Sequence, residues 1–260
     1  MIVSHGVSTM PPNLLILGGT TEAAALCRSL ADLGLAATVS LAGRVADPAP
    51  LALPQRVGGF GGASGLADYI RAHRVTHLID ATHPFAATIS ANAVQASAAT
   101  GTPLVALNRP AWQRQAGDDW QVVPDIPAAV AALERPAERV FLAVGRMNLD
   151  AFAAHPQHFY LLRLVDPLSP PLPFPNYQAR IARGPFSEDG DRALLQDHRI
   201  TLIVSKNAGG TGAVAKISAA RVLGMPVLMI DRPAIPPRDE VGSVAAVLDW
   251  LRHFGIDLGV

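Results

Sequence analysis

The chain has 260 residues, half of them hydrophobic, and its 21 basic residues balance its 21 acidic ones. This length allows one large domain or two of about 130 residues. The balanced charge excludes the strongly basic surface that nucleic-acid or membrane-surface binding requires. The single cysteine excludes a disulfide framework, and no apolar run approaches the roughly 20 residues that span a bilayer.

The start of the chain lacks the basic and apolar regions of a signal peptide. We therefore interpret residues 1–12 as a disordered leader and expect a cytoplasmic protein. In the first half, strands are predicted over residues 14–17, 36–41, 56–57, 77–80 and 103–107, and helices over 21–33, 66–73 and 86–99. This alternation predicts right-handed βαβ crossovers and a parallel sheet.

The second half shows the same alternation. Strands are predicted over residues 120–123, 139–144, 159–165, 177–181, 200–204 and 226–230, and helices over 127–133, 188–198, 213–223 and 241–254. We predict an α/β fold of two tandem Rossmann-like domains with mainly parallel sheets and a ligand cleft between them. Residues 13–124 form the expected nucleotide-binding domain and 125–260 the substrate domain, unless the connecting segments lend a strand to the other half's sheet.

A glycine turn follows the first strand. Gly18, Gly19, Thr20 and Thr21 lead directly into a helix, whose N-terminus offers unpaired N–H groups to an anion. The dinucleotide fingerprint is only partly matched, because Thr20 and Ala23 stand where its second and third glycines belong. The alternative is a merely tight strand–helix connection.

The next two candidates are Gly43-Arg44 and the loop 58–62. An NAD enzyme usually carries a carboxylate after its second strand, whereas an arginine favours the 2′-phosphate of NADPH; the alternative for Arg44 is a solvated loop residue. The loop, Gly58-Gly59-Phe60-Gly61-Gly62, is dense enough in glycine to lie against a flat ligand. Its alternative is a flexible connector.

The segment Asp80-Ala81-Thr82-His83 ends a strand and opens a helix. Thr82 can donate to a phosphate or to a nicotinamide amide. His83 is the most attractive proton carrier, because the ordinary pKa of histidine lies near neutrality. The alternative is that both residues only cap the helix.

In the second half, Ser205-Lys206-Asn207-Ala208-Gly209-Gly210 follows a strand, and Lys216 lies in the next helix. The loop resembles an anion-binding nest but lacks the Walker A ending, which argues against a kinase or ATPase. Arg109, Arg146, Arg163 and Arg232 also lie near strand ends, so we predict a cationic cleft for a polycarboxylate or phosphate. Some of these arginines are expected on the surface. His155 and His158 lack partners at metal spacing.

Together and in this order, these motifs resemble the precorrin-6A reductases of cobalamin biosynthesis. The specific blocks are Asp-Ala-Thr-His-Pro-Phe-Ala at 80–86 and Lys-Asn-x-Gly-Gly at 206–210, and the likeness extends over residues 13–254. Two departures, Ala208 in place of serine and Ser218 in place of aspartate, affect details of the second loop.

The resemblance implies NADPH-dependent reduction of a double bond in the precorrin-6A macrocycle to precorrin-6B, with no flavin and no metal. The expected cofactor-binding residues are Gly18, Gly19, Thr20, Thr21, Glu22, Gly43, Arg44, Gly59, Phe60, Gly61, Ala81, Thr82 and His83, with His83 also the expected proton donor. The expected substrate-binding residues are Arg109, Arg146, Arg163, Ser205, Lys206, Asn207, Gly209, Gly210 and Lys216.

The expected partners are the macrocycle and neighbouring corrin-pathway enzymes that hand it over, without nucleic acid or membrane. Two alternatives stay open: another NADPH-dependent reductase or epimerase on this fold, and a two-domain nucleotide- or anion-sensing module without catalysis.

Overall fold

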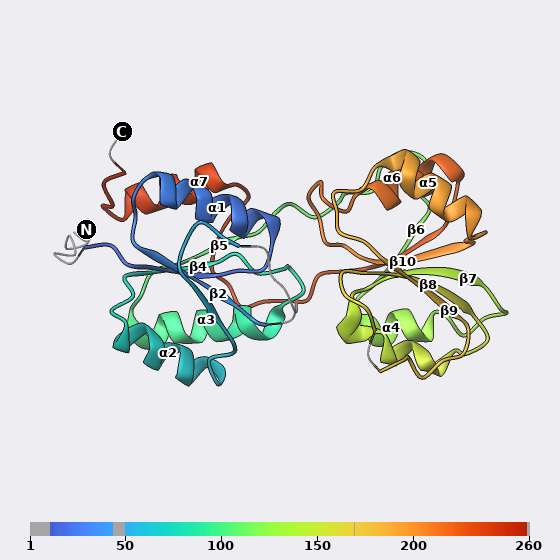
Figure 1. Ribbon diagram of the computed structural model, residues 1–260, viewed down its shortest axis with the longest axis horizontal. Coiled ribbons are helices and arrows are strands. Elements are labelled where there is room, and N and C mark those ends of the chain that lie inside the picture. The colour runs from blue at the N-terminus through green and yellow to red at the C-terminus, as the bar shows by residue number, and fades with distance from the viewer. Residues whose placement is uncertain (1–10, 44–49, 169, 259–260) are drawn as a thin grey trace. The chain divides into compact units, whose positions relative to one another are not determined.

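The computed structural model describes residues 11–43, 50–168 and 170–258. Its two six-stranded sheets are wholly parallel and carry helices on both faces (Figure 1). The predicted α/β architecture of two Rossmann-like sheets is therefore confirmed. No helix in the described ranges is long and apolar enough to cross a membrane.

The first sheet has the strand order β12-β5-β4-β1-β2-β3. Its strands are β1 (Leu14–Leu17), β2 (Ala37–Leu41), β3 (Gln55–Val57), β4 (His77–Asp80), β5 (Leu104–Leu107) and β12 (Asp239–Val241). Helices α1 (Thr21–Asp32) and α7 (Val244–His253) cover one face, and α2 (Gly62–Ala72) and α3 (Ala87–Thr100) cover the other (Figure 1). Strands β2 and β3 are added on one side of β1, and β4 and β5 on the other, so the strand order reverses between β1 and β4. Ligands of open α/β sheets bind at such a reversal.

The second sheet has the order β6-β11-β10-β7-β8-β9. Its strands are β6 (Trp120–Val123), β7 (Arg139–Ala143), β8 (Phe159–Leu164), β9 (Tyr177–Ile181), β10 (Leu202–Lys206) and β11 (Val227–Ile230). Helices α5 (Glu188–Asp197) and α6 (Ala215–Leu223) lie on one face, and α4 (Ile126–Ala131) lies on the other (Figure 1). Two short 3₁₀ helices, η1 (Arg146–Asn148) and η2 (Asp150–Ala154), follow β7.

The division of the chain differs from the predicted boundary at residue 124. One compact unit comprises Met1–Arg109 with Ala234–Val260, and the other comprises Pro110–Pro233. Strand β6, expected in the first domain, pairs with β11 in the second sheet, while β12 returns to pair with β5 in the first. The open alternative of strand lending is therefore realised at both edges, because an edge strand is held by backbone pairing that either sheet can offer.

Strand β1 shows why these residues form the core of the first unit. All four of its residues are buried, and their side chains alternate between the two faces of the sheet. Leu14 and Ile16 pack into the cluster beneath α1 and α7, whereas Leu15 and Leu17 pack into the cluster beneath α2 and α3. Each fully buried leucine contributes about 1.5–3 kcal/mol of transfer free energy. Cys27 of α1 is fully buried in the same core, as a small hydrophobic residue.

Candidate functional site

The glycine turn after β1 builds the helix N-terminus that the sequence predicts. A Cβ on Gly18 would lie 2.7 Å from Val39 Cγ2, and Gly19 has a φ of +117° that favours glycine. Thr20 caps α1 by accepting from Ala23 N at 3.0 Å and donates to Ala81 O at 2.8 Å. Within the described chain, the N–H groups of Gly19, Thr20 and Thr21 donate to no acceptor, so the turn presents three donors to an anion.

Glu22 and Arg109 form an ion pair beside this turn. Arg109 Nη1 lies 2.7 Å from Glu22 Oε2, and Thr21 Oγ1 donates to the same oxygen at 3.0 Å. Partial burial raises the pKa of the Glu22 carboxyl, but the hydrogen bonds and the Arg109 charge outweigh it, so the pKa lies below its ordinary value. Arg109, expected to bind substrate, thus belongs to the first unit and is paired with a carboxylate beside the glycine turn.

The turn after β4 is held by Asp80, whose carboxylate uses both oxygens. Oδ1 accepts from Thr82 N at 3.1 Å and from Thr82 Oγ1 at 2.6 Å, while Oδ2 is paired with Arg238 Nη1. The side chains of Arg238 and Asp80 are only 6% and 1% exposed. The sequence offered no signal for Arg238, which lies just before β12.

His83 follows in the same turn and is half-buried. Its Nδ1 accepts from Phe85 N at 3.2 Å, so the neutral ring carries its proton on Nε2. Thr20 joins this turn to the glycine turn through Ala81, which places Thr82 and His83 next to β1 at the ligand edge of the sheet.

The glycine loop after β3 is anchored rather than flexible. Arg56 donates to the carbonyls of Gly58 and Gly59 at 3.0 and 3.1 Å, and its guanidinium lies 3.9 Å from the centroid of the Phe60 ring. Helix α2 begins at Gly62, four residues earlier than expected from residue 66, because the loop's last glycine already enters the helix. A Cβ on Gly65 would lie 1.7 Å from Phe60 O, so only glycine lets the loop pack on α2.

The segment after β2, from which the sequence predicts a preference for NADPH, is described only as far as Gly43. Gly43, after β2, has a φ of +71°, and Arg44 lies outside the described residues.

The loop after β10 is fixed to the chain around Trp112. Asn207 Oδ1 accepts from Trp112 N at 2.8 Å and its Nδ2 donates to Trp112 O at 3.0 Å. A Cβ on Gly209 would lie 2.2 Å from Pro110 O, and Gly210 N donates to that same oxygen at 3.2 Å. The Asn207 amide is thereby occupied in holding the loop, whereas the sequence predicted substrate contact.

Lys216, at the start of α6, has a buried ammonium group. Its Nζ donates to Ala213 O at 2.6 Å and lies 4.6 Å from the Trp112 ring centroid. A buried cation stabilises a nearby anion strongly, because little water screens it. Lys206 ends β10, and Ser205 before it is fully buried with its hydroxyl donating to Lys206 O at 3.1 Å.

Arg163 does not present the free guanidinium that its expected role requires. Both of its terminal nitrogens bind Asp191, whose side chain is 4% exposed, and its guanidinium stacks 3.9 Å from the centroid of the Phe186 ring. Arg146 follows Gly145 after β7 and opens η1, at the carboxyl end of the second sheet. Arg163 of β8 is therefore a structural residue, whereas Arg146 lies in the segment after β7 at the end of the sheet where ligands bind.

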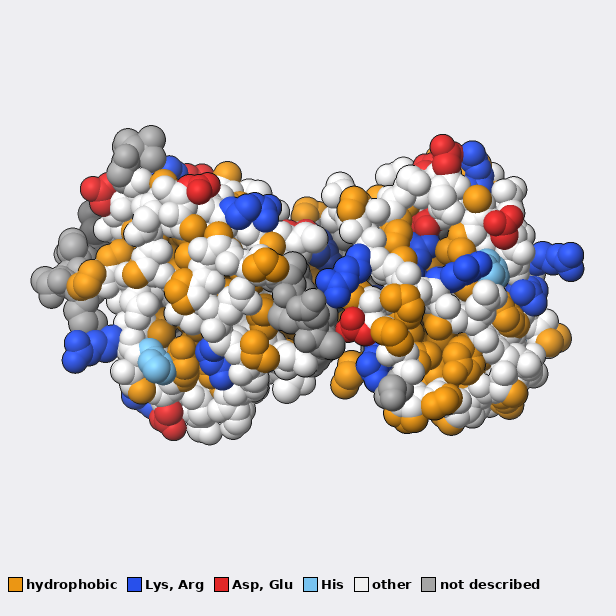
Figure 2. All heavy atoms as spheres, in the orientation of Figure 1, with side chains coloured by type: hydrophobic (Ala, Val, Ile, Leu, Met, Phe, Trp, Pro, Cys, Tyr) orange, Lys and Arg blue, Asp and Glu red, His pale blue; other side chains and the backbone are white. Residues whose placement is uncertain are grey.

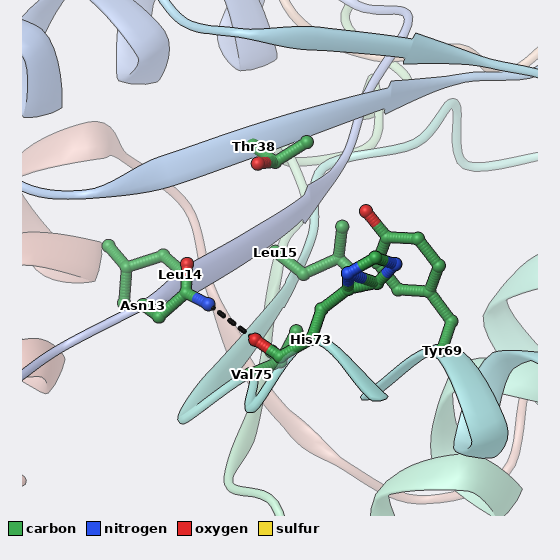
Figure 3. Close-up of a pocket in the computed structure, with 7 residues that line it drawn as sticks. All are labelled: Asn13, Leu14, Leu15, Thr38, Tyr69, His73 and Val75. Carbon is green, nitrogen blue, oxygen red and sulfur yellow. Dashed lines mark hydrogen bonds between the residues drawn. The ribbon is translucent and has the colours of Figure 1, made fainter. Parts of the chain in front are cut away.

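The cavity drawn in Figure 3 lies away from these groups. Its volume is about 150 Å³, and it is lined by Asn13, Leu14, Leu15, Thr38, Tyr69, His73 and Val75. These residues surround the amino ends of β1 and β2, whereas ligands of parallel sheets bind at the carboxyl ends. We therefore do not assign it to the site.

The surface agrees with the balanced composition. On the face shown in Figure 2, basic and acidic side chains are interspersed among neutral ones over both units. Within the described ranges, no group of three or more His, Cys, Asp or Glu side chains could hold a metal ion. The buried His158 is satisfied by the backbone, accepting from Glu138 N and contacting Leu133 O, both at 2.9 Å.

Comparison with known proteins agrees with this arrangement. Residues 13–252 match the family described as precorrin-6x reductase CbiJ/CobK. The precorrin-6A reductase of Rhodobacter capsulatus is 56% identical over 242 residues, which cover 93% of this chain and 96% of that protein. The precorrin-6A reductase of a Sinorhizobium species is 47% identical over 244 residues, covering 94% of each. A solved structure described as CobK precorrin-6A reductase has a TM-score of 0.92 at 55% identity, covering 95% of this chain and 99% of that one.

Proposed function

Because this chain belongs to the precorrin-6x reductase family, we propose that it reduces one double bond of precorrin-6A to give precorrin-6B, with NADPH as the hydride donor. The family makes it an oxidoreductase of cobalamin biosynthesis, and the identity to the relatives extends over nearly the whole chain. The observation that carries the cofactor is the glycine turn after β1, whose three N–H donors have no acceptor among the described residues.

The turn fits a pyrophosphate in shape as well as in charge. Apart from its chain neighbours, no described residue lies within 4 Å of the position a Cβ would take on Gly19, so a ligand can approach the backbone closely. The N–H groups of Gly19, Thr20 and Thr21 bind the phosphate oxygens, and the dipole of α1 stabilises their charge. In this proposal Glu22 makes no direct phosphate contact, because Arg109 holds its carboxylate.

The preference for NADPH rests on the end of β2. No Asp or Glu follows in Ala42-Gly43-Arg44, where NAD enzymes carry the carboxylate that binds the ribose 2′-hydroxyl. Arg44 pairs with the 2′-phosphate in our proposal. Gly59, Phe60 and Gly61 contribute a rigid wall, since Arg56 holds the preceding carbonyls and the Phe60 ring.

Peripheral carboxylates of the substrate are bound by the second unit's cations. We assign Lys206, Lys216 and Arg146 to this role, because Lys206 ends β10, Lys216 lies in the first turn of the helix that follows it, and Arg146 follows β7. Asn207, Gly209, Gly210 and Ser205 shape the loop that carries Lys206. Arg109 and Arg163 are not included, since each is already paired with a carboxylate.

The mechanism requires positioning and one proton. NADPH supplies a hydride when bound. Hydride transfer needs the nicotinamide C4 and the accepting carbon of the macrocycle within about 3–3.5 Å of each other. The cations hold the macrocycle by its carboxylates, so that orientation provides much of the rate enhancement. His83 is our candidate proton donor, and it acts from its imidazolium form, because the neutral ring, in which Nδ1 accepts from the Phe85 N–H, has no readily released proton. We place the reaction in the cytoplasm, with the product handed to neighbouring pathway enzymes.

The decisive experiment measures NADPH oxidation by absorbance, with and without precorrin-6A, under anaerobic conditions. We expect oxidation only with the macrocycle, and a marked loss of the single-turnover rate in His83→Ala. NADPH binding without any oxidation would instead favour a nucleotide-sensing module. Arg44→Ala should reduce the preference for NADPH over NADH; an unchanged preference would contradict the role of Arg44 but not the reaction.

A further inference from the structure

The surroundings of Thr82 determine whether its hydroxyl can donate or accept a hydrogen bond from a ligand. Its hydroxyl lies 2.6 Å from Asp80 Oδ1, and the other carboxylate oxygen of Asp80 forms an ion pair with Arg238. A carboxylate oxygen only accepts, so the hydroxyl proton of Thr82 must point at Asp80. The hydroxyl then has only lone pairs left for any further partner.

Those lone pairs are available to a ligand. Ser90 Oγ lies 3.4 Å from Thr82 Oγ1 and can engage at most one of them, weakly. Thr82 is half-buried and, apart from Asp80 and Ser90, its hydroxyl has no partner in the described part of the chain. A phosphate oxygen, which also only accepts, gains nothing here, whereas an N–H group does.

The position of Thr82 in the sheet indicates which N–H group of a bound dinucleotide would reach its hydroxyl. The residues after β2 lie on one side of the glycine turn, where the ribose of the adenosine is bound in Rossmann folds. Strand β4 pairs with β1 on the other side, and Thr20 ties the two turns through Ala81 O at 2.8 Å. The nicotinamide end of a bound dinucleotide therefore lies on the Thr82 side, and its carboxamide carries N–H donors.

Arg238, which is far from Thr82 in the sequence, holds Asp80 in the position that makes the Thr82 hydroxyl a donor to Asp80 and an acceptor toward a ligand. It reaches Asp80 across 158 residues, and its Nε donates to Glu240 Oε1 at 3.2 Å within the returning segment. Glu240 lies in β12, the edge strand beside β5, so the guanidinium is fixed at both ends. Without this cation, Asp80 Oδ2 would lose its ion-pair partner, and the buried side chain would no longer be held with Oδ1 toward the Thr82 hydroxyl.

We propose that Arg238 and Asp80 are positioning residues that make the Thr82 hydroxyl an acceptor for the carboxamide N–H of the nicotinamide. This inference rests on the proposed use of NADPH and adds the group that is recognised. It excludes the phosphate-binding role that the sequence left open for Thr82.

The test uses binding alone, without turnover. Dissociation constants are measured by titration calorimetry for NADP⁺ and for 3-acetylpyridine adenine dinucleotide phosphate, which carries a methyl group where the carboxamide has NH₂. We expect the unaltered protein to bind NADP⁺ about fivefold more tightly, the value of one ordinary hydrogen bond. Thr82→Val should bind both ligands with similar affinity, whereas Thr82→Ser should keep the difference.

Arg238→Met should also lose the discrimination, and Arg238→Lys should retain part of it. The matched control is Arg221→Met, which removes a comparable arginine from the buried Asp118, 2.8 Å away in the second unit. It should lower stability without changing the ratio of the two affinities.

Retained discrimination in a folded Thr82→Val variant would overturn the inference, even if Arg238→Met does not fold. A uniform loss of affinity for both ligands in Thr82→Val would point to phosphate contact and would also overturn it. Equal affinities in the unaltered protein would overturn this inference but leave NADPH use intact. Absence of NADP⁺ binding to the unaltered protein would overturn both.

Discussion

Replacing Gly209 by alanine tests how the Lys206 loop is held. The backbone φ of Gly209 is +69°, and an added Cβ would lie 2.2 Å from Pro110 O and 2.3 Å from Arg232 Nη2. The left-handed conformation costs about 1–2 kcal/mol for alanine, and overpacking against backbone costs about 1–3 kcal/mol. We therefore expect Gly209→Ala to lower the free energy of unfolding by roughly 2–5 kcal/mol.

The assay is urea unfolding followed by tryptophan fluorescence, since Trp112 packs against this loop. With a typical slope of about 2 kcal/mol per molar, the midpoint should fall by about 1–2.5 M. Gly212→Ala is the control, because no described residue beyond its chain neighbours lies within 4 Å of its Cβ position and its φ is not left-handed. Equal midpoints for the two variants would refute the packing argument.

Two further predictions concern buried charge. Burial lowers the pKa of His77, whose ring faces Trp250 and Phe254. The unfolded chain therefore binds a proton at His77 more readily than the folded protein does. The contribution of the buried neutral ring to the free energy of unfolding is fully present above about pH 6.5 and is lost as the pH falls below it. Unfolding midpoints at about pH 7.5 and 5.5 should therefore differ more for the unaltered protein than for His77→Phe, and equal differences would contradict this. Arg163→Met should lower the free energy of unfolding by about 3–5 kcal/mol, because it leaves the buried Asp191 carboxylate without its ion-pair partner. Adding Asp191→Leu should restore much of this free energy, as measured by urea unfolding. No recovery in the double variant would contradict the ion-pair explanation.

Local patterns in the sequence determined the strands and the glycine turn. The run Leu14–Leu17 is apolar throughout because both faces of β1 are buried, and that pattern is readable without the fold. Thr20 was placed correctly at the helix start, since a cap acts on backbone groups only three residues away. The family motifs at 80–86 and 206–210 were equally local, which is why the reaction class could be predicted.

Strand β12 and the ion pairs were decided by the tertiary structure. Strand β12 has only three residues, two of them acidic, and it is a strand because its backbone pairs with β5 rather than because of its side chains. The same pairing moved residues 234–260 into the first unit. A sequence pattern describes side-chain periodicity, and backbone pairing at an open edge leaves no such signal.

Charge pairing has the same non-local origin. The sequence showed Arg163 and Arg109 in and just after strands and predicted ligand binding, but their carboxylate partners come from other elements of the fold. Arg238 carried no signal, because its partner Asp80 is 158 residues away. The sequence by itself therefore determined which chemical groups stand at the strand ends, and only the fold decided which of them are already occupied by one another.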